Sequence, residues 1–67
     1  MPSLAEAFPA EQARARHLLS VYRDLPDGVG AFGAMMIEAT LADADRAIAS
    51  GDVIAMIRAY EALKDLE

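Results

Sequence analysis

The sequence predicts an all-α protein: a helical hairpin over about residues 28–49 and 52–66, preceded by a helix over about residues 9–24. Two sets of apolar residues recur at the spacing of one helical face: Ile37, Leu41, Ala44 and Ile48, then Val53, Met56, Ile57, Tyr60 and Leu63. Between them, Ser50-Gly51-Asp52 is typical of a tight turn between helices. Two apolar faces joined by so short a turn are buried most efficiently by folding back on each other.

The first helix is expected to begin at Pro9 and to end near Asp24. Proline suits the first position of a helix because its missing N–H is unpaired there. Four apolar residues are expected to form the buried face of this helix: Ala15, Leu18, Tyr22 and Leu25. Ser3 and Glu6 have the spacing of a capping box, so residues 1–8 either contain a short turn over residues 3–8 or form an N-terminal arm.

The segments between the expected helices contain residues typical of turns and caps. Pro26 is expected to end the first helix, and Asp27 can cap the second. Gly51 is expected in the left-handed conformation that ends a helix, with Asp52 capping the third. Small residues at Gly30, Gly33 and Ala34 indicate that another helix approaches closely there.

The composition favours a single small domain that self-associates. A chain of 67 residues buries only about 60% of the surface that its unfolded form exposes, yet 55% of these residues are hydrophobic. The absence of cysteine excludes a disulfide, and the single histidine, His17, makes a structural metal improbable. We therefore expect the three helices to assemble as a homodimeric bundle.

Large apolar side chains gather at the start of the hairpin. Phe32, Met35 and Met36 span more than one face of a helix, so the hairpin cannot cover them all. Together with Tyr22, these residues are the expected dimer interface. The alternative interpretation is a binding groove for another protein, because methionine adapts to irregular surfaces.

The net charge of −5 lies in the hairpin, since residues 1–26 sum to zero. An acidic surface disfavours direct binding to nucleic acid and suits a basic protein partner. We expect Glu38, Asp45, Arg58 and Glu61 to contact such a partner. The arginine-rich strip of the first helix either guides an acidic partner or pairs with the acidic hairpin. With no targeting segment or membrane span recognisable, a cytoplasmic protein is expected.

No pattern of residues indicates catalysis or a cofactor. His17 has no second metal ligand at helical spacing and no nucleophile nearby, so it is interpreted as a surface residue. The glycine-rich run at 28–33 lacks the Lys-Ser/Thr pair and the preceding strand of a phosphate-binding loop. The chain is therefore predicted not to be an enzyme and to bind no metal or cofactor.

The run LPDGVGAFGA at 25–34, followed by AIASGDV at 47–53 and MIRAY at 56–60, resembles small helical host-takeover proteins of transposable phages. This group includes quorum-sensing anti-activators, and the resemblance spans roughly residues 10–66. It implies a dimeric helical protein that binds the DNA-binding domain of a host LuxR-type transcription regulator and blocks access to DNA. It also implies inhibition of type IV pilus assembly through the pilus motor ATPase.

The leading functional hypothesis is thus a protein-binding inhibitor that works by occlusion, located in the host cytoplasm if phage-encoded. The alternative is a small structural or adaptor subunit in phage assembly. Such a subunit would assemble further or pair with a capsid or tail component.

Overall fold

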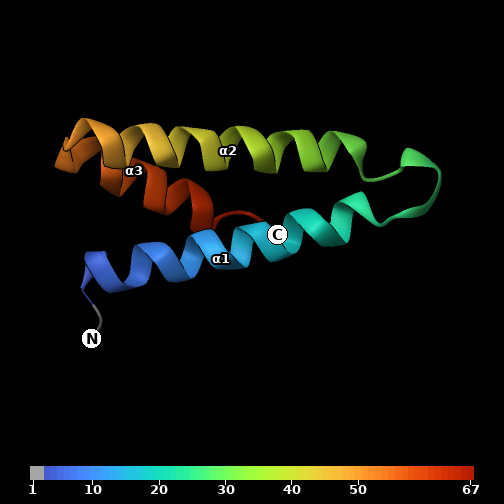
Figure 1. The fold of residues 1–67 in the computed structure, drawn as a ribbon, viewed down its shortest axis with the longest axis horizontal. Coiled ribbons are helices and arrows are strands. Elements are labelled where there is room, and N and C mark those ends of the chain that lie inside the picture. Colours follow the sequence, from blue (N-terminus) through green and yellow to red (C-terminus); the bar gives the residue numbers. More distant parts are fainter. Residues whose placement is uncertain (1–2) are drawn as a thin grey trace.

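Three packed helices make up the computed structural model, which describes residues 3–67 (Figure 1). Helix α1 spans Leu4–Arg23, α2 spans Ala31–Ser50 and α3 spans Val53–Lys64, with a short 3₁₀ turn, η1, at Pro26–Gly28. Within the described residues there are no strands, so the predicted all-α class is confirmed. Helix α2 packs against both other helices, and α3 leans away from α2 toward α1 along its length.

Helix α1 begins at Leu4, so the prediction of a start at Pro9 was wrong. The Ser3 hydroxyl accepts a hydrogen bond from the Glu6 N–H at 3.3 Å, which supplies the cap that the sequence indicated. The helix continues through Pro9 because Phe8, only 3% exposed, reaches the core from its first turns. Residues 3–8 therefore form neither a separate turn nor an arm, and the rest of the predicted arm, residues 1–2, lies outside the described residues.

The connection from α1 to α2 differs from the prediction at Asp27. This residue lies in the 3₁₀ turn in the left-handed region, with φ 58°, and does not cap α2. Helix α2 follows Gly30, which offers no side chain for capping. A Cβ atom at Gly30 would lie 2.0 Å from the Tyr22 carbonyl oxygen, and one at Gly33 would lie 2.4 Å from the Tyr22 ring. The predicted close approach at these glycines is confirmed, with Tyr22 of α1 as the neighbour.

The corner between α2 and α3 forms as predicted. Gly51 ends α2 in the left-handed conformation, with φ 70°. The Asp52 carboxylate accepts hydrogen bonds from the N–H groups of Ile54 and Ala55, at 2.9 and 3.4 Å. At the end of α2, the Gly51 N–H donates to the Ile48 carbonyl, and at the start of α3 the Asp52 carboxylate accepts from two N–H groups that have no partner within the helix.

Small side chains dominate the core. Alanine supplies more than half of its buried apolar members, which are Phe8, Ala15, Leu19, Ala34, Ile37, Ala44, Ala47, Ala59 and Leu63. Alanine lets helices approach closely but removes little apolar area from water. The molecule is correspondingly thin, 39 × 24 × 15 Å, and its shortest dimension is little more than one helix diameter.

Several residues predicted to be buried lie outside this core. Ile48, Val53, Ile57 and Leu25 are exposed, so their predicted burial was wrong. Leu18, Tyr22, Leu41, Met56 and Tyr60 are half-buried and pack against the core, so their predicted burial is confirmed in part. The reason is that the helices meet along Ala44, Ala47 and Ala59, which turns the larger neighbours at positions 48 and 57 outward. Ile48 instead lines an apolar hollow of about 190 Å³ at the end of the bundle, together with Leu4, Ala5, Phe8, Pro9 and Met56.

Candidate protein-binding surfaces

Large apolar side chains are exposed at the start of α2 and just before it. Phe32, Met35 and Met36 are 70%, 56% and 49% exposed, and Val29 beside them is 74% exposed. Phe32, Met35 and Met36, which were predicted to form a dimer contact, are therefore not covered by other parts of the same chain. Tyr22, the fourth predicted member, is half-buried, with its ring against Gly33 and its hydroxyl donating to the Glu67 carbonyl of its own chain.

A second exposed surface, part apolar and part charged, lies on the outward side of α3. Its members follow helical spacing and are exposed: Ile54, Ile57, Arg58, Glu61 and Asp65, called here the α3 face. Ile54 and Ile57 lie among charged side chains, an arrangement typical of a protein-binding site with an apolar centre and a polar rim. The sequence pattern predicted Ile57 in the core. It also identified Arg58 and Glu61 but missed the two isoleucines as binding candidates.

The four predicted partner-contacting residues are all exposed but do not form one cluster. Arg58 and Glu61 belong to the α3 face. Glu38 and Asp45 lie on α2 and turn toward α1, where Arg23 pairs with Glu38 at 2.5 Å and the Gln12 amide donates to Asp45 at 3.3 Å. Only Arg58 and Glu61 are therefore free of polar side-chain partners within residues 3–67.

Two arginines of the strip on α1 contact the hairpin of their own chain. Arg23 pairs with Glu38, and Arg14 reaches the end of α3. The Arg14 guanidinium donates to the carbonyls of Leu63, Lys64 and Leu66 at 2.6, 3.2 and 2.9 Å. Arg16 and His17 stay exposed, so only part of the strip is open to another molecule.

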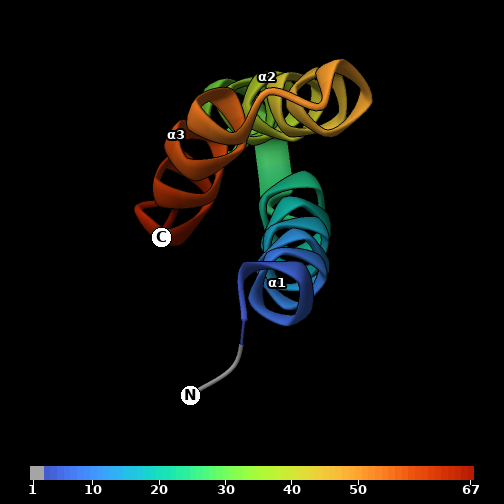
Figure 2. The same ribbon diagram turned by 90° about the vertical axis from the view of Figure 1, so that its left-hand side faces the viewer.

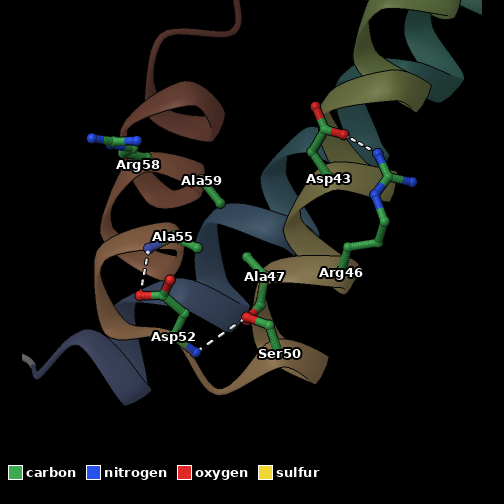
Figure 3. A pocket seen from close by; sticks show the side chains of 8 residues that line it. All are labelled: Asp43, Arg46, Ala47, Ser50, Asp52, Ala55, Arg58 and Ala59. Carbon is green, nitrogen blue, oxygen red and sulfur yellow. Dashed lines mark hydrogen bonds and ion pairs between the residues drawn. The ribbon is translucent and has the colours of Figure 1, made fainter.

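An open groove of about 500 Å³ runs between the end of α2 and the start of α3 (Figure 3). Its lining includes the small side chains of Ala47, Ala55 and Ala59. The Arg46 guanidinium bends toward Asp43, its ion-pair partner, and Arg58 extends away from α2. Asp52 and Ser50 are engaged in hydrogen bonds of the corner. Apart from Arg58, which points away from α2, the polar groups that border this groove therefore serve local structure and do not converge on a ligand.

Among residues 3–67, no three histidine, aspartate or glutamate side chains lie close enough together to share a metal ion. No buried polar side-chain atom in this range lacks a hydrogen-bond partner. The exposed apolar side chains of α2 and α3 are therefore the candidate binding features of the described residues.

Two further findings concern membrane-spanning helices and similarity to known proteins. None of the helices described combines the length and the apolar character needed to cross a membrane. Comparison with models of known protein families, with curated proteins and with solved structures gives no match to this chain.

Proposed function

We propose that this chain is a non-enzymatic inhibitor that acts as a homodimer, binds another protein and occludes a working surface of that partner. The observation that carries the proposal is the α3 face, where Ile54 and Ile57 are exposed between Arg58, Glu61 and Asp65. Exposed apolar side chains rimmed by charges gain free energy when a partner covers them, and the charges select which partner does so.

The partner proposed is the DNA-binding domain of a host LuxR-type transcription regulator, as the sequence resemblance implies. A surface that reads DNA is basic because it contacts phosphates. The inhibitor has a net charge of −5, and Glu61 and Asp65 on the α3 face are acidic. Attraction between the two surfaces favours encounter and directs the α3 face to the region that DNA would occupy. The same resemblance makes a pilus motor ATPase a second proposed target.

The test is competition with DNA, measured by fluorescence anisotropy of a labelled operator bound to a purified LuxR-type DNA-binding domain. We expect the intact protein to release the operator. The double substitution Ile54→Ser/Ile57→Ser should weaken this competition at least tenfold, because two apolar contacts are lost. Val21→Ser is the matched control, since Val21 is an exposed apolar residue on α1.

An unchanged operator signal at saturating inhibitor would contradict the proposed partner. Equal competition by the double variant and the control would contradict the assignment to the α3 face. Binding to the motor ATPase is measured with the same variants, by titration of the labelled inhibitor.

A further inference from the structure

The outward side of α2 repeats with the period of a coiled-coil seam. Its residues are spaced by three and four positions in alternation, and every one of them is exposed: Phe32, Met35, Ala39, Ala42, Arg46 and Ala49, called here the α2 seam. Alternating steps of three and four place side chains along one line of a helix, where they can interlock with those of a second helix. The described residues of this chain supply no such partner helix.

The geometry of the bundle leaves the seam open along the whole of α2. Helices α1 and α3 both lie on the opposite side of α2, against Ala34, Ile37, Ala44 and Ala47 (Figure 2). Glu38 and Asp45, which flank the seam on one side, are held toward α1 by Arg23 and Gln12. A helix approaching the seam therefore meets its alanines without displacing any tertiary contact made by these two carboxylates.

Side-chain size along the seam is uneven, and this decides how two copies can fit. Phe32 and Met35 make the first half bulky, whereas Ala39, Ala42 and Ala49 make the remainder narrow apart from Arg46. Parallel helices would place bulk against bulk at one end and alanine against alanine at the other. Antiparallel helices place the bulky end of each copy against the narrow end of its partner, which allows one interaxial distance along the contact.

We propose that α2 pairs with α2 of a second copy in antiparallel orientation about a two-fold axis between Ala39 and Ala42. In this register Phe32 lies opposite position 49 of the second copy, Met35 opposite position 46, and Ala39 opposite position 42. Each large side chain thus faces an alanine or the aliphatic stem of an arginine. The two alanine layers at the centre let the helix backbones approach closely.

Charge favours the same orientation. Parallel pairing would bring the two Arg46 side chains into the same layer, and like charges repel there. Antiparallel pairing separates them to opposite ends, where each guanidinium lies near the Met35 and Phe32 layers of the other copy. A guanidinium close to an aromatic ring is favourable. Antiparallel helices also align their dipoles head to tail.

The contact is small, and this sets the expected affinity. From Phe32 to Ala49 the seam runs for about 27 Å at 1.5 Å per residue, and a helix is about 10 Å wide. Antiparallel pairing also brings the end that carries exposed Val29 next to the end that carries exposed Val53, which enlarges the apolar contact. The footprint is about 270 Å² per copy before these valines are counted, which is below the roughly 800 Å² per partner of a standard stable interface. We therefore expect weak dimerisation, with dissociation in the upper micromolar range.

This inference rests on the proposed function in one respect: the proposed inhibitor acts as a homodimer. Pairing through α2 is a property of the isolated chain and needs no host partner. Failure of the operator competition would leave it untouched, and failure of pairing would leave the α3 face able to bind as a monomer.

The first test introduces a charge at the centre of the seam. Ala39→Glu keeps a good helix former on α2, so circular dichroism should be unchanged, but it places two carboxylates at the two-fold axis. Sedimentation equilibrium should show dimerisation weakened at least tenfold. Ala13→Glu, at an exposed alanine of α1, is the matched control and should dimerise as the unchanged protein does.

The second test measures orientation by disulfide formation, which is simple because the chain has no cysteine of its own. Chains with Ala39→Cys and chains with Ala42→Cys are mixed and oxidised with glutathione. Antiparallel pairing predicts mostly mixed disulfides between the two variants, because positions 39 and 42 face each other. Mostly like-with-like disulfides would overturn the orientation. A chain that stays monomeric up to about 500 µM, or an Ala39→Glu variant that dimerises normally, would overturn the seam.

Discussion

Arg14 connects α1 to the end of α3 through a single side chain. Its guanidinium donates to three carbonyls at the end of α3 and to the Glu11 carboxylate at 2.8 Å. The carbonyls at the end of a helix lack partners within the helix and carry partial negative charge. A planar group with several donors satisfies them together, which the point charge of a lysine does less well. The short helix α3 is thereby fixed to α1.

We predict that Arg14→Ala lowers the free energy of unfolding by about 1–2 kcal/mol, because charged hydrogen bonds to the α3 carbonyls are lost. Urea denaturation followed by circular dichroism measures this change. Arg16→Ala is the matched control and should have little effect, since the Arg16 side chain has no hydrogen bond or ion pair within residues 3–67. Equal free energies of unfolding for the two variants would show that the Arg14 hydrogen bonds do not stabilise the packing of α1 against α3.

Sequence reasoning placed Arg14 on a basic strip but could not find these acceptors. Backbone carbonyls are the same at every residue, and their position depends on where α3 ends in space. By contrast, the Ser50-Gly51-Asp52 corner was predictable, because each residue there has a local conformational reason for its place.

Helix α1 shows how an element can override a local rule. Pro9 cannot donate a backbone hydrogen bond and disfavours a helix around it, yet α1 passes through this position. The Ser3 cap and the burial of Phe8 offset that cost. The Phe8 ring lies 6.2 Å from that of Tyr60, between centroids, and so joins the start of α1 to α3. These contacts are tertiary, which is why the local pattern predicted a later start.

Replacing the two phenylalanines one at a time separates core from surface. Phe8→Ala should lower the free energy of unfolding by about 3–4 kcal/mol, because a buried ring is lost and a cavity remains. Phe32→Ala, with a ring that is 70% exposed in the single chain, should change the unfolding of dilute monomer by less than about 1 kcal/mol. Thermal unfolding at low protein concentration makes the comparison. A mild effect of Phe8→Ala would contradict the start of α1 at Leu4.

The number and order of the helices followed from periodicity, whereas the buried face of each helix did not. Ala47 and Ala59 form contacts that the larger Ile48 and Ile57 were expected to make. Hydrophobicity ranks isoleucine above alanine for burial, but close helix packing selects the smaller residue. Ile57 of the α3 face and the alanines of the α2 seam were overlooked for the same reason.

At the scale of the whole molecule, a thin three-helix arrangement leaves two different faces uncovered. The α2 seam and the α3 face lie on separate helices, so pairing through the seam leaves both copies of the α3 face available. A two-fold dimer of this kind would present two equivalent binding faces, which suits a regulator that is itself two-fold symmetric. Self-association and inhibition are thus proposed to use separate surfaces.

The most direct test of this account is the molar mass of the unmodified protein in solution, measured by sedimentation equilibrium across the micromolar range. The account predicts a rise from the 7.2 kDa of one chain to twice that value as concentration increases. A mass of 7.2 kDa at every concentration would contradict it, because Phe32 and Met35 of the α2 seam would then remain in water without the partner helix proposed to cover them.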